Sequence, residues 1–185
     1  MKFCPECGTL VEFRIPADDV LPRHVCPQCE TIHYRNPKLV VGCIAEWKGD
    51  ILLCRRAIEP AHGLWTLPAG FMENGESTQQ AALRETLEEA CARTEIDALF
   101  SLISIPHIDQ VHLFYRARLL DTDFSPGTES LETRLFSEEN IPWNELAFRS
   151  VTRCLMSYFA DRQSGRFDFH EEALSPPGLT DHPPG

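Results

Sequence analysis

Three glutamates within five residues form the most chemically suggestive group in the chain. Glu85, Glu88 and Glu89 stand at positions i, i+3 and i+4, so on a helix they share one face. Glu85 and Glu89 are like charges one turn apart, which costs a purely structural helix roughly a few tenths of a kcal/mol. Carboxylates spaced in this way can instead surround Mg²⁺ or Mn²⁺, which prefer hard oxygen ligands. The alternative is an ordinary solvated helix face.

The glutamates need a helix to hold them, and the sequence marks where that helix begins. Ser77 followed by Gln80 is a capping box, which predicts a helix over residues 78–92. At about 100° per residue, the acids lie opposite an apolar arc that we expect to face the core. That arc contains Leu83, Leu87, Ala90 and Cys91.

Four of the eight cysteines indicate a second metal site. Cys4 and Cys7 form one C-x2-C pair, Cys26 and Cys29 form another, and 18 residues separate the pairs. This spacing is typical of tetrahedral zinc bound by four thiolates. Two disulfides in a secreted protein would be the alternative, which the polar, Cys-rich start of the chain disfavours. Four sulfurs close the zinc shell to water, so we expect a structural role.

The overall composition excludes several classes of protein. The 185 residues include 43% hydrophobic and 24% charged residues, which is typical of a globular protein. A formal charge of −11 has the wrong sign for holding nucleic acid through its phosphates, so we expect no nucleic-acid partner. The absence of a long apolar run or signal-like segment predicts no membrane partner and a cytoplasmic location. So acidic a protein needs bound cations or a local basic pocket to hold a phosphorylated substrate.

The pattern along the chain predicts three segments. Residues 1–35 form a zinc ribbon, which is too small to fold without its metal. Residues 36–172 form the main domain, and residues 173–185, rich in proline, are expected to be a disordered tail. The expected strands span 39–47 and 51–56, which form a hairpin, together with 99–105, 111–120 and 133–136, and the expected helices span 78–92 and 150–162.

Residues 70–92 resemble the Nudix box, G-x5-E-x7-R-E-U-x-E-E-x-G-U, in which U is an apolar residue. Thr86 departs from the pattern at an apolar position, Cys91 replaces the second glycine, and Ala92 is small for the last apolar position. The missing glycine leaves the position of the helix end open, because glycine adopts the left-handed C-cap conformation most easily. Every acid of the box is present. The matching residues are Gly70, Glu76, Arg84, Glu85, Glu88 and Glu89.

The resemblance to the Nudix family implies a fold, a chemistry and a set of roles. The implied fold is of the α/β class, an α/β/α sandwich with a mixed sheet, here preceded by the zinc ribbon. Family members hydrolyse the pyrophosphate bond of a nucleoside diphosphate linked to another group. Mg²⁺ or Mn²⁺ would activate water, so no nucleophilic side chain is needed, and Zn²⁺ would be structural. By resemblance, Glu85, Glu88 and Glu89 bind the metal, Arg84 orients them, Glu76 assists at the edge of the site, and Gly70 contacts the substrate.

A loop after the box is expected to supply one more acid. In related enzymes such an acid completes the metal shell or acts as general base, and Glu129 is the preferred candidate. Glu132 is the alternative, although a structural role is favoured for it, and an exposed acidic loop would explain both without catalysis. Aromatic rings could form flat walls for adenine or flavin, but we expect most of them in the core. The rings considered are Trp65, Phe71, Phe114, Tyr115 and Trp143.

Residues outside the box suggest the substrate. A four-Cys ribbon before a Nudix domain resembles the NADH pyrophosphatase group and, more closely, the plant chloroplast FAD pyrophosphatases. The latter resemblance covers most of residues 1–150 and implies FAD or ADP-ribose as a small-molecule substrate, giving AMP plus FMN or ribose 5-phosphate. NADH and oxidised nucleotides are the alternatives. A zinc-ribbon docking protein with an inactive Nudix domain is the alternative from another class, and the sequence leaves open whether the chain forms a homodimer.

Overall fold

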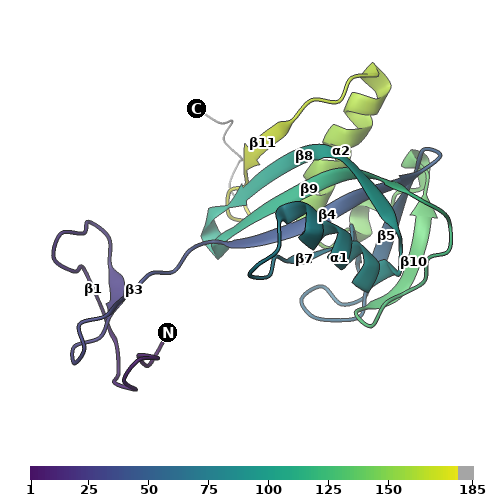
Figure 1. Cartoon of the computed structure of the whole chain (residues 1–185). Coiled ribbons are helices and arrows are strands. Elements are labelled where there is room, and N and C mark those ends of the chain that lie inside the picture. Colours follow the sequence, from purple (N-terminus) through teal and green to yellow (C-terminus); the bar gives the residue numbers. More distant parts are fainter. Residues whose placement is uncertain (179–185) are drawn as a thin grey trace. The chain divides into compact units, whose positions relative to one another are not determined.

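The computed structural model describes residues 1–178 and divides the chain into two compact units. The first unit runs from Met1 to Pro37, and the second begins at Lys38. Each unit has a sheet of its own (Figure 1). The boundary falls two residues later than predicted, because the long first strand of the second unit starts at Lys38.

The first unit is a small antiparallel sheet with two cysteine knuckles. The strands are β1 (Glu12–Arg14), β2 (Arg23–Val25) and β3 (Ile32–His33). In the first knuckle the amide of Gly8 donates to the carbonyl of Cys4 at 2.9 Å, and in the second the amide of Glu30 donates to Cys26 at 3.0 Å. Gly8 and Glu30 both have positive φ angles, 73° and 58°, so the two knuckles turn in the same way.

The second unit is built on an eight-stranded mixed sheet. Its main path is β10–β5–β4–β9–β8–β11, with β6 paired to β5 and β7 paired to β4. The β4–β9 and β8–β11 pairs are parallel and the other pairs are antiparallel. The strands are β4 (Lys38–Trp47), β5 (Asp50–Arg56), β6 (Trp65–Thr66), β7 (Ala69–Phe71), β8 (Thr94–Ile105), β9 (Gln110–Leu119), β10 (Ser130–Phe136) and β11 (His170–Ala173).

Two α-helices cover opposite faces of this sheet (Figure 1). They are α1 (Thr78–Ala90) and α2 (Arg149–Ser164), and short 3-10 turns lie at Pro106–Ile108, Glu138–Asn140 and Trp143–Glu145. Because side chains alternate along a strand, Val41 and Cys43 of β4 pack with α1, whereas Ile44 packs with α2. The predicted α/β/α sandwich with a mixed sheet is therefore what the chain forms.

The expected buried face of α1 is wrong in part. Leu87 is 52% exposed and Cys91 is exposed, although both were expected to face the core. The helix instead buries small residues and two of its acids against the sheet. The buried residues of α1 are Ala81, Ala82, Glu85, Thr86, Glu89 and Ala90.

Two of the three departures from the box, Thr86 and Cys91, are accommodated locally. Thr86 is fully buried, and its hydroxyl donates to the carbonyl of Ala82 at 2.8 Å, so no polar atom is left without a partner. Cys91 adopts the left-handed conformation with φ of 50° and donates its amide to Leu87 at 2.8 Å. The helix therefore ends at Ala90 without a glycine, two residues earlier than predicted.

The predicted disordered tail is wrong at its start. Ala173 belongs to β11, and Leu174 is 3% exposed in the core beneath α2. The Leu174 amide donates to the carbonyl of Ser104 at 2.8 Å, continuing the pairing of β11 with β8. The part of that prediction covering residues 179–185 lies outside the described residues. Within residues 1–178, no helix is both long enough and apolar enough to cross a membrane.

Candidate active site

The short strand β7 brings the start of the box against α1. A Cβ atom on Gly70 would lie only 2.2 Å from Oε2 of Glu85, so the absence of a side chain leaves room for that carboxylate. One residue earlier, the backbone amide of Ala69 donates to Oε2 of Glu89 at 3.0 Å. The β7 backbone therefore binds Glu89 and leaves space for Glu85, and Gly70 itself lines the cavity described below.

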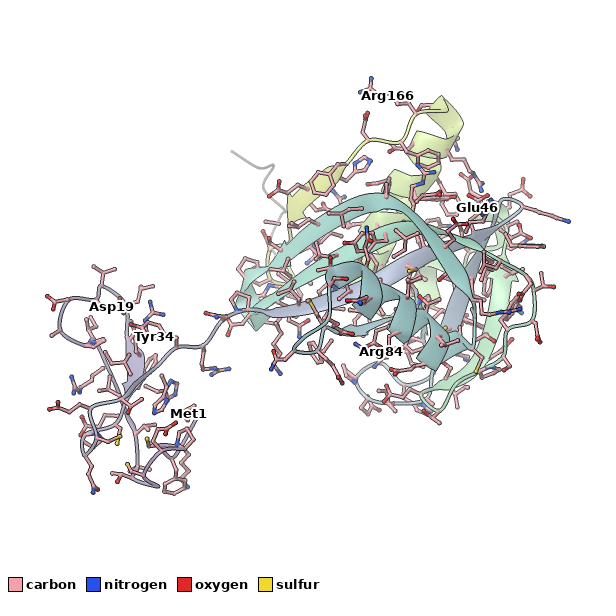
Figure 2. All side chains as sticks on the ribbon, viewed as in Figure 1. Met1, Asp19, Tyr34, Glu46, Arg84 and Arg166 are labelled. Carbon is pink, nitrogen blue, oxygen red and sulfur yellow. The ribbon has the colours of Figure 1, made fainter. Side chains whose placement is uncertain are left out.

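Arg84 binds three acids at once. Its Nε and Nη2 donate to the two carboxylate oxygens of Glu76 at 3.0 and 2.7 Å, a bidentate pair. Its Nη1 donates to Glu85 at 2.7 Å and to Glu88 at 3.1 Å. Nη2 also donates to the carbonyl of Phe71 at 3.1 Å. Arg84, labelled in Figure 2, thus links Glu76, Glu85 and Glu88 to β7.

The loop that carries Glu129 is tied to the end of α1. The amide of Gly127 donates to the carbonyl of Glu89 at 3.0 Å, and the amide of Ser125 donates to that of Ala90 at 3.0 Å. A Cβ atom on Gly127 would lie 1.7 Å from the carbonyl oxygen of Glu88, so no other residue type fits there without movement of the loop. The carbonyl of Glu129 accepts from the amide of Ala57 at 2.8 Å.

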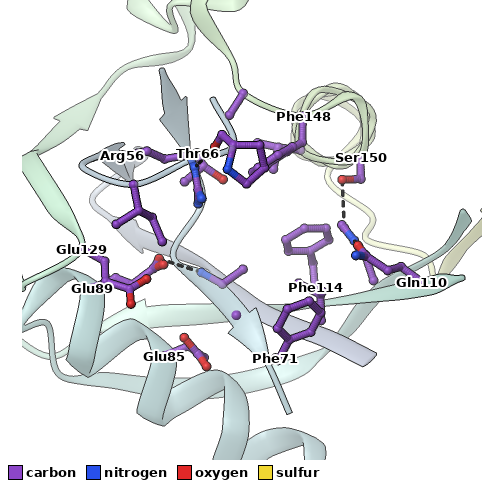
Figure 3. A pocket seen from close by; sticks show the side chains of 18 of the residues that line it. Arg56, Thr66, Phe71, Glu85, Glu89, Gln110, Phe114, Glu129, Phe148 and Ser150 are labelled. Carbon is purple, nitrogen blue, oxygen red and sulfur yellow. Dashed lines mark hydrogen bonds between the residues drawn. The ribbon is translucent and has the colours of Figure 1, made fainter. Parts of the chain in front are cut away.

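These segments surround a cavity of about 1050 Å³. Glu85, Glu89 and Glu129 lie together at one side of it, as Figure 3 shows, and Glu88 and Arg84 also line it. Gln110 and Ser150 lie on the other side, with Phe71 and Phe114 between. Glu132, the alternative to Glu129, does not line the cavity: it sits in β10 beside Arg55 and 4.0 Å from Arg134.

Burial changes the acidity of two of the box glutamates. Loss of hydration, together with the nearby charges of Glu85 and Glu129, raises the pKa of Glu89 to about 7, against the opposing effect of the Ala69 amide. Burial also raises the pKa of Glu85, although Arg84 opposes this. Carboxylates that repel one another in a shielded site are stabilised by a bound cation. This donor set, all oxygen and partly buried, fits a hard divalent ion such as Mg²⁺ or Mn²⁺.

The sequence reasoning missed Arg56, a cation that lines this acidic cavity. Its Nε donates to the carbonyl of Pro60 at 2.9 Å, and its guanidinium lies 5.1 Å from the ring centroid of Phe148. The neighbouring Arg55 instead donates to the carbonyl of Gly63 at 2.8 Å and does not line the cavity. Arg55 and Arg56 are adjacent arginines at the end of β5, and neither belongs to a motif. Because side chains alternate along a strand, only one of the two can face the cavity.

The aromatic candidates divide between the core and the cavity. Trp65 and Tyr115 are buried, at 4% and 5% exposed, as most of the rings were expected to be. Phe71, 48% exposed, and Phe114, 1% exposed, both line the cavity, whereas Trp143 does not.

Comparison with known families agrees with this geometry. The NUDIX domain family model matches residues 36–157, and the Nudix N-terminal zinc-ribbon model matches residues 2–35. The chain belongs to the Nudix hydrolase family. A crystal structure of a Nudix hydrolase from Nitrosomonas europaea is 56% identical, with a TM-score of 0.93, and the match covers 95% of this chain and all of that one. The predicted family, fold and enzyme class are therefore confirmed.

Two curated Nudix relatives differ in the substrate that they are named for. An ADP-ribose pyrophosphatase from Methanocaldococcus jannaschii is 32% identical over 119 residues, which is 62% of this chain and 69% of that protein. The NAD-capped RNA hydrolase NudC from Pseudomonas aeruginosa is 30% identical over 167 residues. That second match covers 89% of this chain but only 57% of NudC. A relative named for a capped RNA means that the expectation of no nucleic-acid partner stays a prediction.

The N-terminal ribbon of this Nudix hydrolase brings its four cysteines together. The Sγ atoms of Cys4, Cys7, Cys26 and Cys29 all lie within 4.8 Å of one another, as tetrahedral zinc requires. The Thr31 hydroxyl, 3.2 Å from Sγ of Cys29, lowers the pKa of that thiol to about 6, which favours the thiolate that binds metal. Within the part of the chain that the structure describes, these cysteines form no disulfide.

Proposed function

We propose that this Nudix hydrolase cleaves the pyrophosphate bond of an adenosine diphosphate-linked small molecule, with ADP-ribose as the leading substrate. The observation that carries the proposal is the cluster of Glu85, Glu88, Glu89 and Glu129 at one side of a cavity large enough for a dinucleotide. Arg56 supplies a positive charge on the wall of the same cavity. The similarity to a curated ADP-ribose pyrophosphatase supports this substrate.

The proposed roles follow from the contacts that hold each side chain. Glu85, Glu88 and Glu89 would hold Mg²⁺ or Mn²⁺, with Glu76 supporting them through Arg84. Such an ion supplies neutralisation of phosphate charge and acidification of water when it is bound. Arg84 is already engaged by three acids, so it positions ligands and does not itself bind substrate.

Arg56 and Glu129 would act on the reacting groups directly. Arg56 is held by the Pro60 carbonyl and the Phe148 ring, and a guanidinium fixed in this way can pair with a phosphate on two of its nitrogens. The carboxylate of Glu129 faces the same space as Glu85 and Glu89 (Figure 3). Its oxygens would accept the proton of the attacking water, which is the work of a general base.

Product analysis tests this function. The full chain, loaded with zinc, would be incubated with Mg²⁺ or Mn²⁺ and separately with ADP-ribose, FAD, NADH and an oxidised dGTP. We expect AMP and ribose 5-phosphate from ADP-ribose, and AMP and FMN from FAD if the resemblance to FAD pyrophosphatases extends to substrate. Neither pair of products should form when the Glu88→Gln variant replaces the wild type. Turnover of oxidised dGTP alone, or of nothing by a folded, zinc-loaded chain, would contradict the proposal.

NAD-linked substrates are the second candidate, because the match to NudC spans the zinc ribbon as well as the Nudix domain. A capped RNA carries many phosphates, which a chain of charge −11 repels at low salt. We therefore expect the free dinucleotide to be cleaved faster than the same dinucleotide at the 5′ end of an RNA. Faster release of NMN from capped RNA would favour a NudC-like activity instead.

A further inference from the structure

Opposite the acids, the cavity wall carries a chain of three polar side chains on two elements. Gln110 and His112 come from β9, and Ser150 comes from the first turn of α2. Nδ1 of His112 lies 3.0 Å from the Ser150 hydroxyl, and Nε2 lies 2.9 Å from Oε1 of Gln110. His112 and Ser150 are buried, at 6% and 1% exposed. None of these three residues has a part in the proposed hydrolysis.

The hydrogen bonds among these three side chains have one donor-to-acceptor direction, from Ser150 to His112 and from His112 to Gln110. An amide oxygen only accepts, so Nε2 of His112 carries the hydrogen and donates to Gln110. Nδ1 is then the acceptor, and the Ser150 hydroxyl donates to it. Burial lowers the pKa of His112 to about 4, which keeps the ring neutral and the direction fixed at neutral pH. Ser150 and His112 together therefore hold the Gln110 amide in a single orientation.

That orientation leaves part of the Gln110 amide available. Oε1 accepts one hydrogen from His112 and has a second lone pair, while Nε2 has no hydrogen-bond partner within residues 1–178. Gln110 lines the cavity. It thus presents a donor and an acceptor side by side, the pattern that a glutamine uses to bind the N6 and N7 edge of adenine. Guanine and hypoxanthine present two acceptors on that edge and cannot satisfy it.

The surroundings of Gln110 suit a flat ring. Gln110, His112 and Phe114 alternate along β9 and share one face of the sheet. Val40 lies beside His112 on one side and beside Phe71 on the other, in the register of β9, β4 and β7. Phe71 is 48% exposed and lines the cavity, so its ring is open to contact. Two strand spacings, about 10 Å, separate β7 from β9, leaving room for a ribose between the acids and the amide.

We propose that Gln110, held by His112 and Ser150, selects adenine in the substrate of this enzyme, and that Phe71 provides the ring on which the base stacks. This inference rests on the proposed function. It assigns the residues that bind the adenine, which is the end of the substrate distant from the acids. Stacking on an aromatic ring tolerates every base, whereas the paired donor and acceptor of Gln110 do not. The two residues therefore contribute affinity and selectivity separately.

The test compares substrates that differ at one exocyclic group. ADP-ribose and inosine diphosphate ribose differ only at the purine, where the latter has a carbonyl in place of the N6 amino group and a hydrogen on N1. We expect wild-type kcat/KM to favour ADP-ribose by about 10-fold or more. Gln110→Ala removes both the donor and the acceptor that face the base, and it should reduce that ratio to about 1. Phe71→Leu should raise KM for both substrates and leave the ratio unchanged.

Two controls make the outcome decisive. Gln163→Ala removes an exposed glutamine of α2 that binds Glu138, away from the cavity, and should change neither KM nor the ratio. AMP and inosine monophosphate, measured by calorimetry with wild type and Gln110→Ala, report base selection without hydrolysis, so a failed activity assay does not decide this question. Equal affinity for the two monophosphates in wild type, no binding of AMP, or an unchanged ratio in a folded Gln110→Ala would overturn the inference.

Discussion

The carboxylate of Glu85 occupies the space that a side chain on Gly70 would need, with Oε2 only 2.2 Å from the ideal Cβ position. The absence of a side chain on Gly70 in β7 therefore determines where the Glu85 carboxylate of α1 can lie. Gly70→Ala should displace Glu85 and reduce kcat by about 100-fold, the effect of a small misplacement of a catalytic group. Steady-state kinetics with ADP-ribose, alongside a thermal melt, would measure it.

A second glycine substitution separates stability from site geometry. Gly165 ends α2 with φ of 74° and has nothing within 4 Å of its Cβ position. Gly165→Ala should cost roughly 1 kcal/mol of stability but leave kcat unchanged. Equal losses of activity in the two variants would indicate that Gly70→Ala acts through folding and not through Glu85.

Glu129 and Glu132 provide a matched pair of carboxylates in one segment. Glu129 lines the cavity with the box acids, while Glu132 faces Arg134 on β10. If Glu129 is the general base, Glu129→Gln should lower kcat by about 100-fold or more, a typical effect for a lost acid–base group. Glu132→Gln should retain activity within about threefold. Activity that survives the first substitution but not the second would reverse the assignment.

Arg55 and Arg56 form a second matched pair. Arg56→Ala should raise KM for ADP-ribose by about 10-fold, because it removes a charge-assisted contact to phosphate. Arg55→Ala loses its hydrogen bond to the Gly63 carbonyl, so it should lower stability slightly without raising KM. A KM that does not change in Arg56→Ala would place the phosphate elsewhere in the cavity.

The raised pKa of Glu89 predicts a pH dependence of metal binding. Folding raises this pKa from its usual 4.5 to about 7, so the fold favours the protonated acid. Without metal, its stabilising contribution is present below pH 4.5 and is lost as the pH rises through 7. A metal needs the carboxylate, so protons compete with it below pH 7.

Calorimetric titration with Mn²⁺ would measure this competition. The dissociation constant should rise by about 10-fold for each pH unit below 7 and level off above it, because one proton is released on binding. In Glu89→Gln the overall affinity should be weaker and the pH dependence between 6 and 7 should be lost. A wild-type affinity that is constant between pH 5.5 and 8 would exclude Glu89 as a ligand with this pKa.

Zinc removal should affect the ribbon alone. The ribbon has only a three-stranded sheet besides its metal site, whereas the second unit has its own core. Thiol labelling with mass spectrometry would follow the change. With zinc, only the exposed Cys91 should react. With a chelator, Cys4, Cys7, Cys26 and Cys29 should react as well, while the buried Cys43, Cys54 and Cys154 stay protected. Labelling of those three would mean that the whole chain unfolds.

Much of the fold could be predicted because local signals agreed with the final structure. The capping box of Ser77 and Gln80 forms as expected, with both of its hydrogen bonds, and the hairpin of β4 and β5 matches its apolar runs. Strand β11 was missed because its four residues, His-Glu-Glu-Ala, have no apolar pattern and pair through the backbone with β8.

The site was predictable where residue types are fixed by the box and unpredictable where the fold brings separate segments together. An amphipathic pattern assigns carboxylates to solvent, yet Glu85 and Glu89 turn toward the sheet because β7 offers them a glycine and a free amide. Arg56 and Gln110 have no motif around them. They enter the site only because β5 ends and β9 begins beside the cavity, and the sequence pattern carries no information on such long-range pairing.

The short strand β11 also determines how much of the edge strand β8 is open to strands of other chains. It covers β8 only from Ser101 to Ser104, so the earlier part of β8 remains an open sheet edge, where unpaired backbone groups can recruit a strand from another chain. That stretch carries Glu95 and Asp97, each paired with an arginine of β9. Charges on an edge oppose strand addition. A chain cut before His170 would expose the apolar end of β8 and should aggregate more readily than the full chain.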